Sequence, residues 1–182
     1  MALSVELAHG NVTLAMCYDL EVLPRMRQIK IIVEKQTDPN GDPQVFDFDL
    51  SYGDLDADLS DGQTDNSGDL DPGTYSVAEN TPAGWNLTSA TCSDGSQVNA
   101  ISLQAGETVT CTFDNLKLAT LTIVKDADPN DLQDFTFTRS FGANFLLDDD
   151  QSVFGGDTTL LAASTFPNLT PGSYTVTENI PN

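Results

Sequence analysis

A lysine, a glutamate and an asparagine occupy positions that strand alternation turns toward the interior of the protein. Each closes a run in which every second residue faces the core: Lys35 in Ile29–Lys35, Glu79 in Tyr75–Glu79 and Asn115 in Val109–Asn115. An amine, a carboxyl and an amide buried apart from one another would each be costly, because nothing would replace their hydrogen bonds to water. We therefore expect the three side chains to meet in one buried polar cluster. Only 7 basic residues occur in the chain, so a lysine at a core-facing position is notable.

The segments that carry these side chains have the composition of β-strands. Six stretches are short and rich in β-branched or aromatic residues: Ile29–Lys35, Val45–Ser51, Thr74–Asn80, Asn86–Cys92, Val98–Leu103 and Thr108–Asn115. Gly, Pro, Asp or Asn separates them at a spacing typical of β-sandwiches. No helix of normal length is indicated from Leu118 onward. We predict an all-β fold in which each complete copy is a sandwich of about seven strands.

The chain contains an internal repeat. Two blocks of the first copy, Ile31–Asn40 and Leu70–Asn80, return as Leu121–Asn130 and Leu169–Asn179. The equivalent lysines are 90 residues apart and the equivalent tyrosines 99 apart, so the second copy carries a loop insertion. These boundaries predict closing strands of a preceding or neighbouring domain in residues 1–28, a complete sandwich in 29–117 and an incomplete one in 118–182. Tandem copies of one domain are typical of arrays that provide reach or stiffness.

Four short motifs point to a known family. They are the strand lysine Lys35, the Gly-x-Tyr-x-Val-x-Glu segment Gly73–Glu79, the turn Pro82-Ala83-Gly84-Trp85 and the terminal Phe113-Asp114-Asn115. Together they resemble the Cna-B or SpaA-type prealbumin-like repeats of prokaryotic surface and pilus proteins, fully over Ile29–Asn115 and partly over Leu118–Asn182. The resemblance implies tandem prealbumin-like (Cna-B-like, Ig-like) β-sandwiches, one complete and one incomplete.

The resemblance also implies a reaction for the buried cluster. In that family the lysine can attack the asparagine side chain to form an internal isopeptide bond, with the glutamate as proton shuttle. Burial of Lys35 and Glu79 favours the uncharged amine and acid that this reaction with Asn115 requires. The alternative is a buried Lys35–Glu79 pair that hydrogen bonds to Asn115 without a cross-link. In the second copy, Lys125 and Glu178 occupy the equivalent positions, and the third member is missing.

The N-terminal segment has the features of a donated strand. Ser4–Gly10 resembles Ala100–Gly106, which precedes the last strand of the complete copy. Apolar residues then alternate strictly, as in an inserted strand: Val12, Leu14, Met16, Tyr18 and Leu20. An incomplete sandwich invites strand addition from a neighbour, and such head-to-tail contacts propagate into filaments. The alternative is that the chain is a segment of a longer array of repeats.

Three cysteines are present. Cys92 and Cys111 flank a short segment of the first copy, while Cys17 stands apart. No Cys-x-x-Cys pair occurs and His9 is the only histidine, so a zinc site is not indicated. We expect a Cys92–Cys111 disulfide, which contributes about 3 kcal/mol in the chain-entropy model. Two buried free thiols are the alternative.

The charge of the chain is strongly negative. It carries 28 acidic against 7 basic residues, a net charge of −21, which repels nucleic acid and anionic lipid. No apolar run reaches the roughly 20 residues that a membrane-spanning helix needs.

We expect no cofactor. Weak calcium candidates are Asp54, Asp56 and Asp58, whose loop does not match an EF-hand and is otherwise a solvated acidic loop.

Asparagines of three N-x-Ser/Thr sequons are candidate glycosylation sites, namely Asn11, Asn86 and Asn168. Motifs of enzymes are missing from the sequence, including the Gly-x-Ser-x-Gly elbow, the phosphate-binding loop and metal-ligand spacings. We therefore expect no enzymatic turnover and at most one self-catalysed isopeptide bond.

The predicted function is that of an extracellular or cell-surface filament, pilus-like fibre or stalk, assembled from copies of itself or as a longer array. The alternative is an adhesin module that recognises a glycan or protein ligand.

Overall fold

The structure is a computed structural model that describes residues 29–128, 133–149 and 160–179. Every regular element in these ranges is a β-strand, and none of the described residues forms a helix that could cross a membrane. The first copy contains β1 (Lys30–Asp38), β2 (Phe46–Leu50), β3 (Asp56–Leu59), β4 (Thr64–Asn66), β5 (Gly73–Tyr75), β6 (Val77–Asn80), β7 (Trp85–Cys92), β8 (Ile101–Leu103) and β9 (Thr108–Lys117). The second copy contains β10 (Ala119–Val124), β11 (Phe135–Arg139), β12 (Phe145–Leu147), β13 (Ala163–Leu169) and β14 (Val176–Asn179).

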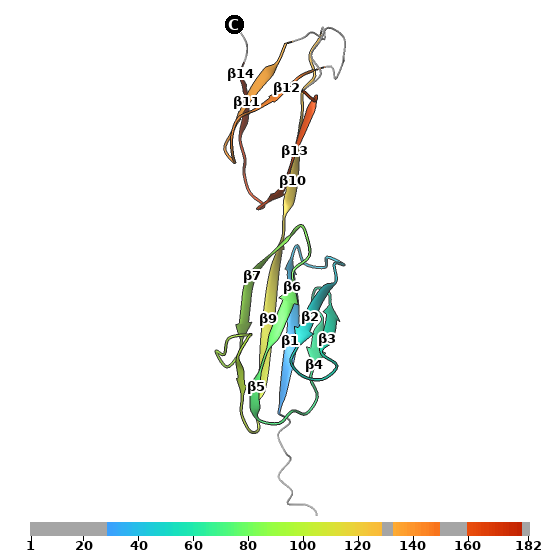
Figure 1. The fold of residues 1–182 in the computed structure, drawn as a ribbon, viewed down its shortest axis with the longest axis vertical. Coiled ribbons are helices and arrows are strands. Elements are labelled where there is room, and N and C mark those ends of the chain that lie inside the picture. Colours follow the sequence, from blue (N-terminus) through green and yellow to red (C-terminus); the bar gives the residue numbers. More distant parts are fainter. Residues whose placement is uncertain (1–28, 129–132, 150–159, 180–182) are drawn as a thin grey trace, which may run out of the picture.

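The first copy is a β-sandwich, here called the first module. One sheet has the strand order β4-β1-β9-β7 and the other the order β3-β2-β6, with β5 and β8 forming an additional pair (Figure 1). Within the larger sheet, β1 and β9 run parallel and pair from Lys30↔Thr108 to Asp38↔Leu116, whereas β7 pairs antiparallel with β9. The first and last strands of the module are therefore direct neighbours.

Alternating apolar residues of the two sheets form the core of the first module. Ile31 and Val33 of β1 and Phe46 and Phe48 of β2 are completely buried, and so are Val109 and Cys111 of β9. Aromatic edges fix the packing between the sheets: Phe46 meets Trp85 at a ring-centroid distance of 5.2 Å, and Phe48 meets Phe113 at 5.1 Å. Burying a large apolar side chain contributes about 1.5–3 kcal/mol, so this layer stabilises the sandwich.

The second copy, here called the second module, repeats the opening part of the first. Strand β10 pairs with β13 as β1 pairs with β4, and β11 lies between β12 and β14 as β2 lies between β3 and β6. The longer connection of this copy lies between β12 and β13. Phe137 and Leu147 are buried, but Leu121 and Ile123 of β10 are only half-buried, unlike Ile31 and Val33. In the described residues the second sandwich is thus incomplete, and the fold is all-β with tandem sandwiches, as predicted.

The strand prediction was correct for the apolar segments and wrong in three details. Strands β3 and β4 were missed, because Asp56–Leu59 and Thr64–Asn66 are polar and form by pairing with β2 and β1. The predicted strand Thr74–Asn80 is interrupted at Ser76, so that β5 pairs with β8 while β6 pairs with β2. The predicted strand Val98–Leu103 is shorter, since β8 begins at Ile101.

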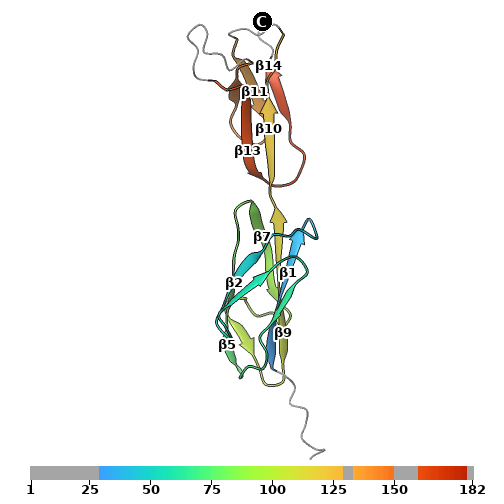
Figure 2. The same cartoon turned by 90° about the vertical axis from the view of Figure 1, so that its right-hand side faces the viewer.

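The two modules follow one another along the long axis of the molecule (Figures 1 and 2). Only Leu118 separates β9 from β10, so the last strand of the first module continues almost directly into the first strand of the second. The backbone N–H of Leu118 donates to the carbonyl of Gly84 over 2.8 Å, which holds the connection against the turn before β7.

Candidate functional site: a buried lysine, glutamate and asparagine

Lys35 lies on β1 with its whole side chain inside the first module, at 0% exposure. Alternation along β1 places it on the same face as Ile31 and Val33. Its Nζ donates to Asn115 Oδ1 over 2.8 Å and to the carbonyls of Gln36 and Phe113 over 2.6 and 3.1 Å. Three acceptors therefore satisfy the three donors of the ammonium group.

Glu79 reaches the same point from β6, in the opposite sheet. Its side chain is fully buried, and its Oε2 lies 3.6 Å from Lys35 Nζ. Its Oε1 accepts a hydrogen bond from Asn115 Nδ2 over 2.6 Å and another from the Thr81 hydroxyl over 3.0 Å. The amide of Asn115 is thus held between the amine and the carboxylate, and the three predicted residues form one cluster that joins both sheets.

The surroundings of the cluster shift the equilibrium of the lysine toward its neutral form. Burial lowers the pKa of Lys35 from its ordinary value, and the nearby charge of Glu79 opposes this without reversing it. Phe46 covers the amine, with Nζ 4.2 Å from the ring centroid. A neutral amine, an adjacent carboxyl group and an amide held between them are the groups that amide exchange between Lys35 and Asn115 requires.

The second module holds two of the three groups. Lys125 Nζ lies 3.7 Å from Glu178 Oε1 and 3.9 Å from the centroid of the Phe135 ring, as Lys35 lies near Glu79 and Phe46. The pair is less covered than its counterpart, since the side chain of Glu178 is 36% exposed. Within the described residues no asparagine stands where Asn115 would be, because no strand pairs with β10 on the side opposite β13.

The predicted disulfide is confirmed, and the alternative of two free thiols is wrong. Cys92 and Cys111 are bonded and occupy opposite positions on β7 and β9. Cys111 is completely buried and Cys92 nearly so. The bond therefore secures β9, the strand that also carries Asn115, to the edge strand of its sheet.

The remaining predicted residues are dispersed. Asn86 is exposed on β7 and Asn168 is exposed on β13, whereas Asn11 lies outside the described residues, as do the donor-strand candidates Val12, Leu14, Met16, Tyr18 and Leu20. Asp54, Asp56 and Asp58 are exposed at and after the turn between β2 and β3. Among the described residues no group of three His, Cys, Asp or Glu side chains could hold a metal ion. Calcium binding at these aspartates stays a prediction.

Two contributors to the cluster were missed from the sequence. The Phe46 ring contacts the amine across the sandwich, and nothing in the local sequence indicates that pairing. Asp61 holds the end of β1: its carboxylate accepts the N–H groups of Thr37 and Gly41, each over 2.6 Å. An Asp-Gly pair such as Asp61-Gly62 indicates a turn, but the fold sets the partner of its carboxylate 24 residues away.

Comparison with known proteins agrees with this architecture. Residues 31–117 match the sequence model of the SpaA_4 prealbumin-like fold domain, and no curated protein matches the chain. Among solved structures, a streptococcal ancillary pilin is 14% identical, with a TM-score of 0.38 over 85% of this chain and 54% of that chain. The chain thus spans about half of the length of that pilin.

Two structures of the pilus adhesin SpaC from Lactobacillus rhamnosus GG are also similar, each with a TM-score of 0.32. The longer one is 17% identical over 83% of this chain and 24% of that chain, and a C-terminal fragment is 16% identical over 84% and 75%. Residues 31–117 of this chain form a prealbumin-like fold domain of the SpaA type.

Proposed function

We propose that the chain is a section of an extracellular filament, pilus-like fibre or stalk at the cell surface, in which sandwich modules in series carry tension. The observation that carries this proposal is the parallel pairing of β1 with β9, reinforced by the buried contact between Lys35 and Asn115. The resemblance of the first module to surface-protein repeats supports the same location.

The parallel arrangement determines how the first module responds to pulling. The polypeptide enters the module at Lys30 and leaves it at Lys117, at opposite ends of the sandwich (Figure 1). Tension between these points acts along β1 and β9, so their nine paired positions are sheared together instead of being opened one at a time. A shear geometry resists force better than an unzipping geometry, because many hydrogen bonds must break in the same event.

The cluster adds a contact between side chains of β1 and β9 to the hydrogen bonds between these strands. Two chemical states of the cluster fit its geometry. In the first, Lys35, Glu79 and Asn115 remain an uncrosslinked hydrogen-bonded cluster. In the second, Lys35 Nζ bonds to Cγ of Asn115, the Cγ–Nδ2 bond breaks, and Glu79 passes one lysine proton to the departing nitrogen, which leaves as ammonia. The intact mass distinguishes them, since the second state is lighter by about 17 Da, the mass of ammonia.

The second module supports the proposal of assembly by strand donation. In the first module, β1 is covered on one side by β4 and on the other by β9; in the second, the described residues cover β10 on the β13 side alone. We propose that Val12–Leu20 of a neighbouring copy pairs with the open edge of β10 and covers Leu121 and Ile123. An open strand edge beside half-buried apolar side chains favours such an addition.

Electron microscopy of the purified chain tests the proposed function. Head-to-tail assembly predicts filaments whose axial repeat matches the long dimension of one folded copy. A monodisperse preparation of single particles at high protein concentration would count against self-assembly by this chain.

A further inference from the structure

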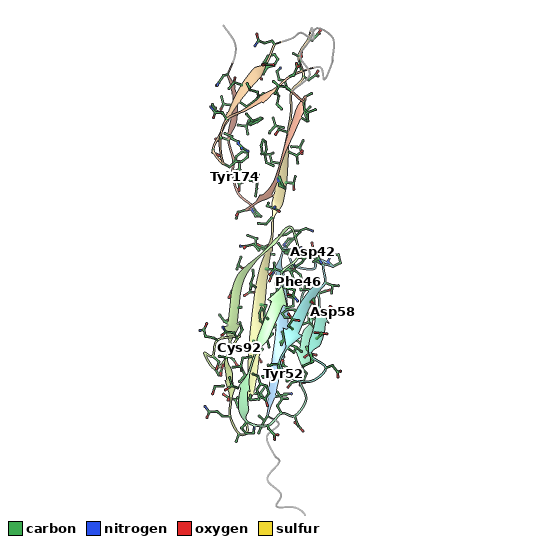
Figure 3. All side chains as sticks on the ribbon, in the orientation of Figure 1. Asp42, Phe46, Tyr52, Asp58, Cys92 and Tyr174 are labelled. Atoms are coloured by element: carbon green, nitrogen blue, oxygen red, sulfur yellow. A yellow bond between two sulfur atoms is a disulfide. The ribbon has the colours of Figure 1, made fainter. Side chains whose placement is uncertain are left out.

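A polar cavity lies at the edge of the first module and shares no lining residue with the lysine cluster. It measures about 180 Å³ and lies where the edge strands β3 and β4 of the two sheets face each other. Its walls include Leu50, Tyr52, Asp54, Asp56, Asp65 and Asn66. Figure 3 shows Tyr52 toward the end of the module that is remote from the second module, whereas Asp42 marks the near end.

The strand register directs one of these carboxylates inward. Asp65 of β4 is paired with Val33 of β1, and residues opposite one another in a sheet share a face. Since Val33 is completely buried, Asp65 lies on the interior side of the sheet, where it is half-buried. Asp54 lies in the turn before β3, and Asp56 begins that strand. In the described part of the chain, none of the three carboxylates forms a salt bridge with a lysine or arginine.

Tyr52 supplies an independent sign that the cavity is built for a ligand. The residue is only 5% exposed, and its hydroxyl is buried without any hydrogen-bond partner. Its ring packs edge-on against Tyr75 at a centroid distance of 5.8 Å. Burial, and then the charge of Asp65, raise the pKa of Tyr52, which keeps the hydroxyl protonated.

We propose that this cavity receives a primary ammonium group on an alkyl stem, namely a lysine side chain of a partner protein. An ammonium group has three donors and no acceptor, which suits the carboxylates of Asp65 and Asp54 and the Tyr52 oxygen. Leu50 and the Tyr52 ring provide apolar walls for the methylene stem. The net charge of −21 attracts a basic partner toward the site.

A metal ion fits the cavity less well than an ammonium group. Calcium requires several oxygens that converge within about 2.6 Å of one point. No group of three carboxylates in the described residues is close enough for that. An ammonium group accepts longer distances of about 2.7–3.2 Å to each oxygen and a neutral hydroxyl among its partners.

Titration of the full chain with Nα-acetyl-lysine methylamide, followed by backbone amide NMR shifts, tests the proposal. Saturable shifts confined to residues 50–56 and 64–67 are expected. The Nε-acetylated form of the same probe lacks the ammonium group and should cause none. Shifts of equal size with the acetylated probe, or saturable shifts at the same residues with calcium chloride alone, would overturn the proposal.

Three variants make the test specific. Tyr52→Phe should weaken binding by about threefold to tenfold, the effect of one hydrogen bond, without lowering the urea midpoint, because the lost hydroxyl had no partner in the free protein. Asp65→Asn should weaken binding further. Asp58→Asn, which removes the same charge from β3 outside this cavity, is the matched control and should leave binding nearly unchanged. Equal weakening by Asp58→Asn, unaltered binding by Tyr52→Phe, or marked destabilisation by Tyr52→Phe would each contradict the site.

Discussion

Lys35 and Asn115 connect the first strand of the complete module to its last, with Lys35 Nζ donating to Asn115 Oδ1 over 2.8 Å. The two residues are 80 positions apart in sequence, yet β1 and β9 are immediate parallel neighbours. Glu79 closes the cluster from the opposite sheet. The cluster therefore links the two strands by which the chain enters and leaves the module.

Removing the lysine should destabilise the first module strongly. Lys35→Met leaves the Glu79 carboxylate and the Asn115 amide buried without their partner, and breaking a buried ion pair in this way typically costs about 3–5 kcal/mol. Urea unfolding of the uncrosslinked protein measures the effect. Lys117→Met is the control, since the Lys117–Asp42 pair lies at the surface and its removal should change the midpoint little.

Replacing the whole cluster by apolar residues should undo most of that loss. In the variant Lys35→Met/Glu79→Leu/Asn115→Leu no buried polar group is left unpaired, and such replacements are often neutral. A triple variant less stable than Lys35→Met alone would show that the three groups do not act as one unit.

Stability should rise with pH when the lysine is not cross-linked. Because the pKa of Lys35 is lowered from 10.5 in the folded state, the unfolded chain binds more protons between the lowered value and 10.5. The free energy of unfolding therefore increases with pH across that window. The rise should be absent in Lys35→Met, and in an isopeptide-linked protein, whose amide nitrogen does not titrate. Urea unfolding of the uncrosslinked protein and of Lys35→Met, from neutral pH to about 10, measures this rise. If the difference in unfolding free energy between the two proteins became smaller as the pH rises, the prediction would be contradicted.

Loss of the disulfide should weaken the first module while leaving its fold intact. Cys92→Ala/Cys111→Ala opens a loop whose ends are 19 residues apart, and the chain-entropy model gives about 3 kcal/mol for a loop of this size. Urea unfolding followed by the fluorescence of Trp85, which packs on Phe46, reports on this module. An unchanged urea midpoint would mean that the disulfide hardly reduces the conformational entropy of the unfolded chain.

Deletion of residues 1–28 should abolish filament formation if neighbouring copies donate that segment to β10. The first module should keep its stability, because its own strands β1 to β9 form the complete sandwich. Light scattering and electron microscopy measure assembly, and urea unfolding provides the control for folding. Filaments that persist after the deletion would exclude donor-strand joining by this segment.

The sequence predicted the parts of the fold that depend on local alternation. Ile31, Val33 and Lys35 share one buried face, as do Val109, Cys111 and Asn115, because a strand alternates regardless of its partners. The repeat likewise identified Lys125 and Glu178, which form an ion pair. Polar strands such as Thr64–Asn66 were missed, since they owe their conformation to pairing with β1.

Other features depend on contacts between distant segments and leave no local signal. The parallel register of β1 and β9 and the position of Phe46 over the amine of Lys35 are of this kind. So is the unpaired hydroxyl of Tyr52, which shares a cavity with Asp65 of the neighbouring sheet. Such contacts can be identified only from the three-dimensional structure of the sandwich.

Single-molecule stretching of the chain by its two ends tests the central claim most directly, namely that the first module carries tension through β1, β9 and the contact between Lys35 and Asn115. We predict that the first module unfolds after the second, at a higher force, and that Lys35→Met lowers that force. In the cross-linked state, the segment between Lys35 and Asn115 should not extend at all. A first module that unfolds at the same force as the second, unaffected by Lys35→Met, would contradict the account.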